Sequence, residues 1–226
     1  MNVKVIVLGV ACLVPCALVA QNTIRDQVYF GAMGGVATLS GDASAVITPT
    51  AASTSSYDPS NGAAASVFAG THIRNYVSLQ ADYVWNRNDV VLTSSVNGPG
   101  GSSFYHLPES VVQNAFLGNA LIYFQKRGSR LRPYLSLGGG AVLIHSRLSS
   151  GAIVSGNPAL PPASSHHASI AQRTSVGLDV RLGDSWYFRY SFGETIARNT
   201  FGDQLSPPEH RVAKNFQSLF GIYFRL

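Results

Sequence analysis

The stretch Val77-Ser-Leu-Gln-Ala-Asp-Tyr-Val-Trp-Asn86 decides the fold class, because its side chains alternate between apolar and polar. One side of the extended chain carries the apolar residues Val77, Leu79, Ala81, Tyr83 and Trp85. The other side carries the polar residues Ser78, Gln80, Asp82 and Asn86. A period of two is typical of a β-strand that separates an apolar from a polar environment. Residues 173–182 and 186–193 repeat the pattern.

Working outward from this stretch, the sequence predicts eight strands. They cover residues 27–39, 65–73, 76–87, 113–125, 132–147, 168–182, 185–198 and 214–226. Three connections are short, at 74–75, 126–131 and 183–184. Four are long, polar and expected to be mobile, at 40–64, 88–112, 148–167 and 199–213. Short and long connections alternate, which is typical of outer-membrane barrels with short turns at one end and long loops at the other.

The N-terminal segment has the composition of a secretory signal peptide. Lys4 precedes an apolar run that reaches about Ala20, so we expect a cleaved segment 1–20 and a barrel domain 21–226. A transmembrane anchor is the alternative, and Pro15 argues against it. Both cysteines, Cys12 and Cys16, lie in the cleaved part, which excludes disulfides and thiolate chemistry from the mature chain.

Composition narrows the class of protein further. Charged residues make up 12% of the chain, about half the usual share of a soluble domain. Without Lys4, 15 Lys and Arg stand against 11 Asp and Glu, and no basic stripe suggests nucleic-acid binding. The densest basic group, Lys126–Arg132, sits in one short turn and could touch anionic lipid headgroups.

Two observations favour an eight-stranded, antiparallel, up-and-down transmembrane β-barrel over a soluble barrel that carries an apolar ligand. The apolar faces hold rows of large aromatic residues that a small barrel interior could not accommodate. The aromatics also cluster at two heights, as membrane interfaces select. We expect the girdle near the short turns to contain Tyr29, Phe30, Tyr123, Phe124, Tyr134, Trp186, Phe188, Tyr223 and Phe224. We expect the opposite girdle to contain Trp85, Phe116 and Phe216.

Three stretches are similar to a known family: residues 75–83, residues 118–124 leading into 132–140, and the closing strand. By these stretches the chain resembles the OmpA-like outer-membrane β-barrel domain family, without its peptidoglycan-binding domain. The resemblance implies that residues 219–226 are a C-terminal signal for the outer-membrane assembly machinery, with Gly221, Phe224 and Leu226 at its key positions. Leu226 stands where Phe is usual in that signal, and Leu219 stands where a polar residue is usual.

Charged residues on the polar faces predict an ion-pair network inside the barrel. Its expected members are Asp82, Arg173, Asp179, Arg181, Arg189, Glu194 and Arg225. Mixed signs favour mutual neutralisation over a selectivity lining, and side chains fill the interior of an eight-stranded barrel. A wide pore is therefore not expected.

The sequence offers little evidence for a catalytic, metal-binding or phosphate-binding site. His145, Ser146 and Glu194 supply the residue types of a lipid-acting barrel enzyme, but their surroundings do not resemble the known motif. The histidines show no converging spacing that predicts a metal site, and no cofactor is expected. Gly138–Gly140 lacks the residues of a phosphate loop.

The sequence thus predicts a non-enzymatic, monomeric outer-membrane barrel with a structural or surface-interaction role. Its expected partners are outer-membrane lipids and the assembly machinery, with an unknown external partner and no nucleic acid. A lipid-acting barrel enzyme is the alternative, and an exported soluble barrel that binds an apolar ligand is the second.

Overall fold

The computed structural model describes residues 27–199, 205–208 and 212–226, and the signal peptide predicted at 1–20 lies outside them. The described strands are β1 (Val28–Leu39), β2 (Asp42–Ile47), β3 (Ala52–Pro59), β4 (Gly62–Arg74), β5 (Val77–Gly98), β6 (Gly101–Tyr123), β7 (Leu131–Leu148), β8 (Ile153–Ser155), β9 (Ser164–Arg181), β10 (Trp186–Ala197) and β11 (Ala213–Arg225). No helix within these described residues is long and apolar enough to cross a membrane.

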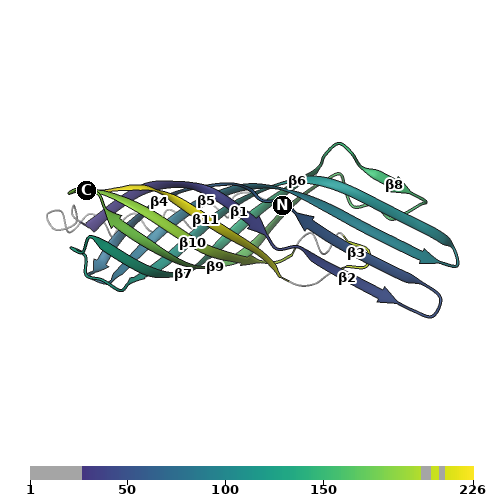
Figure 1. Cartoon of the computed structure of the whole chain (residues 1–226), viewed down its shortest axis with the longest axis horizontal. Helices are drawn as coiled ribbons and strands as arrows, with labels where there is room; N and C mark the ends of the chain where they lie inside the picture. The colour runs from purple at the N-terminus through teal and green to yellow at the C-terminus, as the bar shows by residue number, and fades with distance from the viewer. Residues whose placement is uncertain (1–26, 200–204, 209–211) are drawn as a thin grey trace, which may run out of the picture.

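Eight of these strands close into one antiparallel barrel. Hydrogen-bonded neighbours follow each other around the wall in the order β1, β4, β5, β6, β7, β9, β10, β11 and back to β1. The seam between β1 and β11 runs from Tyr29 opposite Arg225 to Leu39 opposite Asn215. The predicted up-and-down barrel is confirmed, and so is the pairing of the last strand with the first (Figure 1).

The short connections all lie at one end of the barrel, here called the proximal end. They join β4 to β5, β6 to β7, and β9 to β10, as the sequence predicted. The chain terminus lies at the same end, where the backbone N–H of Leu226 donates to the carbonyl oxygen of Val28 at 3.0 Å. Both ends of the barrel sequence are therefore tied together beside the short turns (Figure 1).

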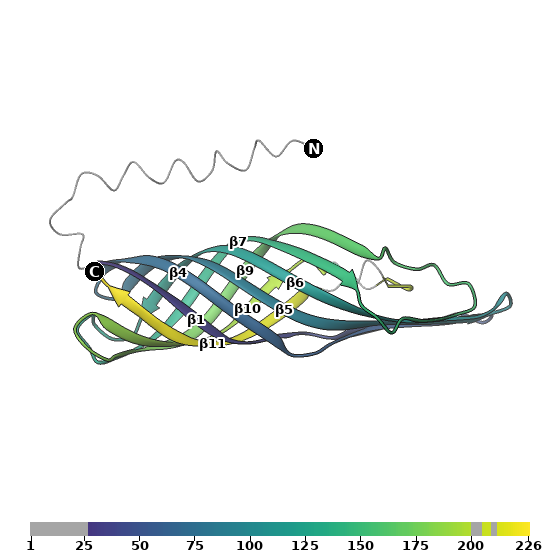
Figure 2. The same cartoon turned by 90° about the horizontal axis from the view of Figure 1, so that it is seen from above.

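Beyond the opposite end, several strands continue as a flatter sheet that we call the distal sheet. It consists of residues 42–47, 52–59, 90–98, 101–109 and 153–155. β5 has 22 residues and β6 has 23, and their far halves pair up to a turn at Pro99-Gly100. β3 adds to β5, β2 adds to β3, and β8 adds to β6. The distal sheet projects away from the proximal end (Figures 1 and 2).

The prediction of long loops at 40–64 and 88–112 is wrong. The first region holds β2, β3 and the start of β4, and the second is a continuous hairpin of β5 and β6. Their Ser, Thr and Ala residues suggested loops because few large apolar side chains mark the strands. In the distal sheet the ladder pairs the backbone groups of β3 and β5 on both sides and those of the edge strand β2 on one side.

The two other predicted loops differ less from the structure. Region 148–167 contains the short strand β8 and the beginning of β9, with irregular chain between them. Region 199–213 lies partly outside the described residues.

Alternation along each barrel strand sorts side chains between the interior and the outer surface. In β5, Ser78, Gln80 and Asp82 are buried, whereas Leu79 is 49% exposed on the opposite face. In β11, Gln217 and Tyr223 are buried inside, whereas Phe220 is 58% exposed. The polar faces thus point inward and the apolar faces outward, the reverse of a soluble barrel that carries an apolar ligand.

The outer surface carries aromatic residues at two heights, but the proximal girdle is smaller than predicted. Tyr29, Tyr123, Tyr134 and Tyr223 are buried inside the barrel. Phe30, Phe124, Trp186, Phe188 and Phe224 remain on the outer face. Strand parity explains the difference, because each of these tyrosines falls on the inward-facing alternation of its strand. Trp85, Phe116 and Phe216 lie on the outer face nearer the distal end, as predicted.

Candidate functional site

An Arg–Asp pair occupies the centre of the barrel interior near the proximal end. Arg189 of β10 and Asp179 of β9 are register partners on adjacent strands. The Arg189 Nε donates to Asp179 Oδ1 at 2.6 Å, and its Nη2 donates to Oδ2 at 2.8 Å. Both side chains are fully buried. The bidentate geometry matches the planar guanidinium to the carboxylate and is the strongest form that such a pair takes.

Neutral polar side chains satisfy the remaining hydrogen-bonding capacity of this pair. The hydroxyls of Tyr123 and Tyr223 each donate to Asp179 Oδ2 at 3.0 Å. Arg189 Nη1 donates to Gln80 Oε1 at 2.6 Å, and Tyr29 donates to the same oxygen at 3.0 Å. These contacts join strands from opposite sides of the barrel. The two buried charges are therefore compensated within one cross-barrel network.

A second group lies next to this centre and is linked to it through Gln80. The Gln80 Nε2 donates to Asp82 Oδ1 at 2.8 Å, and Asn119 Nδ2 donates to Asp82 Oδ2. Arg173 Nη1 donates to Gln217 Oε1 at 2.7 Å. Asp82 and Arg173 thus lie inside the barrel where the sequence placed them, each held by an amide.

Three other predicted members of the ion-pair network lie elsewhere. Arg181 is at the proximal rim, where it pairs with the exposed Asp184 at 3.0 Å. Arg225 is at the same rim and donates to the carbonyl oxygen of Asp184 at 3.2 Å. Glu194 is on the outer face of β10, 3.4 Å from Lys214 Nζ, so placing it inside was wrong. Positions 189 and 194 differ by five, an odd number, so strand alternation points Glu194 to the outer face while Arg189 points into the barrel.

Aromatic rings fill much of the space around Arg189. Its guanidinium carbon lies 4.8 Å from the ring centroid of Phe68 and 4.7 Å from that of Tyr223. Tyr223 in turn stacks on Tyr187 with centroids 4.8 Å apart and planes 4° from parallel. At this level the interior is a packed layer of side chains, which suits a rigid core rather than a wide channel.

Sequence reasoning missed the neutral partners of the network. Gln80 bridges the two groups, while Tyr123 and Tyr223 supply hydroxyls to Asp179. The signal that could have found them is the alternation itself. Tyr223 shares its parity with Arg225, which was predicted to belong to the interior network.

Described residues of the segment that follows β10 contact the distal sheet at the distal mouth of the barrel. Asn199 Nδ2 donates to the hydroxyl of Tyr57 at 3.1 Å. Further along, Ser55 donates to the carbonyl oxygen of Pro207 at 2.7 Å, and Ser94 donates to that of Ser206. β10 and β5 occupy opposite positions in the ring of eight strands. The described part of this connection therefore reaches across the opening to the distal sheet.

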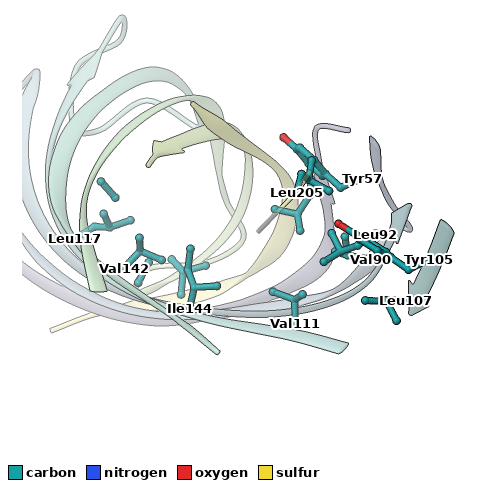
Figure 3. Close-up of a cluster of buried hydrophobic side chains, with 14 residues drawn as sticks. Tyr57, Val90, Leu92, Tyr105, Leu107, Val111, Leu117, Val142, Ile144 and Leu205 are labelled. Atoms are coloured by element: carbon teal, nitrogen blue, oxygen red, sulfur yellow. The ribbon is translucent and has the colours of Figure 1, made fainter. Parts of the chain in front are cut away.

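A cluster of buried apolar side chains packs Leu205, in the segment after β10, against the inner face of the distal sheet. Leu205 packs with Tyr57, Leu92 and Tyr105, all of them buried (Figure 3). The cluster continues along the barrel wall to Leu117, Val142 and Ile144. Burial raises the pKa of the Tyr105 phenol, which keeps it in the neutral form within this cluster.

The residues of the enzyme alternative do not converge. His145 and Ser146 are neighbours on β7, so His145 faces outward while Ser146 is buried and contacts the Ser165 hydroxyl at 2.8 Å. On β9, the register partners of His145 and Glu194 are His166 and Thr174. These are separated by eight residues, or about 27 Å of strand. Among the described residues, no three His, Cys, Asp or Glu side chains form a metal-binding group.

The three residues of the predicted assembly signal lie on the closing strand. Gly221 faces inward, and a Cβ on it would collide with the carbonyl oxygen of Ala32 in β1. Phe224 packs on the outer face with Phe30 and Trp186, with ring centroids at 5.9 and 5.2 Å. Leu226 is 52% exposed at the end of the seam. Recognition of these residues by an assembly machinery stays a prediction.

Solved structures of bacterial barrels are similar to this chain. The crystal structure of Neisserial surface protein A is 14% identical, with a TM-score of 0.51, over 88% of this chain and 97% of that protein. The attachment invasion locus protein of Yersinia pestis is 10% identical, with a TM-score of 0.47 and coverage of 88% and 99%. The N-terminal barrel domain of Pseudomonas aeruginosa OprF is 13% identical, with a TM-score of 0.41 and coverage of 89% and 98%.

These likenesses concern the fold. The Neisserial barrel supports the closed barrel architecture. No protein-family model matches the chain, and neither does any curated protein. The resemblance to the OmpA-like family therefore stays a prediction.

Proposed function

We propose that this chain is an integral outer-membrane protein whose barrel is a non-enzymatic anchor and whose distal sheet is a contact surface outside the cell. The observation that carries the proposal is the length of β5 and β6. A membrane-crossing strand needs about 9–11 residues. β5 and β6 have 22 and 23, and their excess builds the distal sheet.

The barrel surface supports the anchoring part of this proposal. Its outward side chains between the two aromatic girdles are apolar, including Leu79, Leu137, Val176, Phe220 and Ile222, each about half exposed. Exposed apolar surface of this extent is costly in water and favourable in a bilayer. Outer-membrane lipids would cover this band, and the proximal turns would face the periplasm.

The distal sheet supports the contact part. Its strands carry few charges: its five segments contain the acidic residues Asp42, Asp58 and Glu109, no Lys or Arg, and one histidine, His106. Its outer face presents small side chains such as Ala43, Ala45, Thr54 and Thr93, with a shallow hollow of about 270 Å³ among them. A flat, neutral surface of hydroxyl and methyl groups suits a neutral partner better than a strongly charged one.

Cysteine labelling on intact cells tests the location and orientation. Both natural cysteines lie at Cys12 and Cys16, so a mature chain starting near Gln21 offers a cysteine-free background. Asn97→Cys, at the exposed end of the β5–β6 hairpin, should react with a membrane-impermeant maleimide on whole cells. Gln125→Cys, in an exposed proximal turn, is the matched control and should react only after the outer membrane is permeabilised.

The outcome separates the alternatives. Labelling at position 97 alone supports display outside the cell. Equal labelling at both positions, or recovery of the chain in the soluble periplasm, would overturn the proposal. A lipid-acting enzyme would instead release acyl chains from membranes when the wild type is expressed, and would stop doing so in His145→Ala or Ser146→Ala.

A further inference from the structure

Two histidines face each other on the outer surface of the barrel wall. His145 of β7 and His166 of β9 are register partners and project from the same face. Their ring centroids are 4.1 Å apart and their planes are inclined by 31°. The two Nδ1 atoms are 3.0 Å apart. The proposed anchoring and display roles use neither side chain.

In the metal-free chain the two nitrogens share a hydrogen bond, and their separation also suits two ligands of one metal ion. Metal ions of the zinc type bind imidazole nitrogen at about 2.0–2.1 Å. For bond angles at the metal from about 90° to 109°, two such nitrogens lie roughly 2.9–3.4 Å apart. The observed 3.0 Å falls within this interval. Adjacent antiparallel strands place the two side chains directly opposite each other on one face, which brings both ligands together.

The pair lies beyond the apolar band, where hydrated ions can reach it. His145 is 14 residues from the proximal start of β7 at Leu131, and 14 residues of tilted strand rise about 35 Å along the barrel axis. The apolar band of such a barrel is about 25 Å tall. A hollow of about 390 Å³ adjoins the two rings, and its wall also includes Asn114, Leu143, Ile144, His167 and Ala168. It leaves room for water or an anionic oxygen to complete a coordination shell.

We propose that His145 and His166 form a two-histidine site for a divalent transition metal. Imidazole ligands select zinc, copper or nickel over calcium and magnesium, which prefer oxygen. Since no third His, Cys, Asp or Glu among the described residues joins the pair, the protein supplies two ligands and solvent supplies the rest. Such a site exchanges its metal readily and is weaker than a closed structural zinc site.

Copper titration of the purified, untagged barrel in detergent micelles tests the site. The wild type should bind one equivalent of Cu²⁺, with a paramagnetic resonance spectrum showing coupling to two imidazole nitrogens. His145→Ala and His166→Ala should each lower the affinity at least tenfold and remove the two-nitrogen coupling. His167→Ala is the matched control and should leave both unchanged, because strand alternation points His167 to the opposite face of β9.

Heat-modifiable migration on a denaturing gel, measured for every variant, shows that the barrel is folded. Folded His145→Ala that still binds one equivalent with wild-type affinity would overturn the proposal. So would a wild type that binds Cu²⁺ no more tightly than the double variant, or a His167→Ala variant that loses the site as fully as His145→Ala. Zn²⁺ and Ni²⁺ titrations followed by calorimetry should give the same order of variants.

Discussion

Arg189 and Asp179 face each other across two neighbouring strands and share two hydrogen bonds, of 2.6 and 2.8 Å, in a fully buried setting. Burying either charge alone would cost several kcal/mol of free energy, so each side chain depends on the other for its buried position. Gln80, Tyr123 and Tyr223 hydrogen-bond to this pair, and Tyr29 hydrogen-bonds to Gln80, so the network connects strands on several sides of the barrel. The barrel is therefore tied together through its middle as well as around its wall.

Removing one partner of this pair should destabilise the barrel strongly. Arg189→Met leaves the Asp179 carboxylate buried without its counter-charge, and breaking such a pair costs about 3–5 kcal/mol. Urea unfolding in detergent micelles, followed by tryptophan fluorescence, measures the loss. Arg181→Met is the control, because the Arg181–Asp184 pair is at the exposed rim and should have no measurable effect. Equal losses in the two variants would show that the interior pair has no special role.

A charge on the outer face should be tolerated according to its depth in the membrane. Phe220 and Phe224 share the outer face of β11, with Phe220 nearer the middle of the band. Phe220→Arg should cost about 2–4 kcal/mol in lipid bilayers, whereas Phe224→Arg should cost about 0–1 kcal/mol because it lies at the interface. Folding titrations into lipid vesicles measure both. A soluble barrel would show no such ordering.

The seam between the first and last strands should be sensitive to one methyl group. A Cβ at Gly221 would collide with the Ala32 carbonyl oxygen and come within 2.6 Å of Met33 Cα. Gly221→Ala should therefore push β1 away from β11 and slow barrel closure in refolding assays. Gly118→Ala is the matched control, since its Cβ would meet only the Gly139 carbonyl oxygen at 4.0 Å. Similar refolding rates for both variants would contradict close packing at the seam.

Because of Glu109, the free energy of unfolding should decrease as the pH rises above the ordinary pKa of a glutamate side chain. Glu109 lies on β6, seven residues beyond the girdle residue Phe116, and its buried Oε2 has no hydrogen-bonding partner among the described residues. Burial raises its pKa above the ordinary value of 4.5, although a hydrogen bond from Ser146 opposes this. The folded state therefore binds the proton more tightly than the unfolded state, and stability decreases from pH 4.5 up to the raised pKa.

The Glu109→Gln variant checks that sign. It keeps the shape of the side chain but removes the titration, so its midpoint of thermal unfolding should vary less over this pH range than that of the wild type. At neutral pH the variant should be at least as stable as the wild type, because no buried carboxylate has to be desolvated. A wild type whose stability rises with pH through this range would contradict the assignment.

The barrel could be predicted from the sequence because the patterns that indicate it lie within single strands and the connections between them. Alternation in Val77–Asn86 gives the facing of each side chain, and alternation of short with long connections gives the up-and-down order. The pairing of β1 with β11 then follows, because a closed barrel leaves no other partner for the last strand. The same reasoning placed Asp82, Arg173, Asp179 and Arg189 inside.

The wrong or missing predictions concern features that depend on how strands pair and face one another. The distal sheet forms because β3 and β5 align Tyr57 with Leu92 under Leu205, and that contact joins segments far apart in the chain. Glu194 was misplaced because charge was given more weight than strand parity. The facing of His145 toward His166 required the register of β7 against β9, which the sequence does not show.

The unbroken passage of β5 and β6 from barrel wall to distal sheet has a mechanical consequence. Both strands run without a turn, from Val77 to Gly98 and from Gly101 to Tyr123, although Pro108 in β6 cannot donate a backbone hydrogen bond. A force applied at the Pro99-Gly100 tip is therefore transmitted along two continuous backbones into the barrel. Cross-strand pairing, from Val77 opposite Ile122 to Gly98 opposite Gly101, holds the two backbones together along this path. A pull on the tip would therefore load the barrel wall itself and not a separate linker.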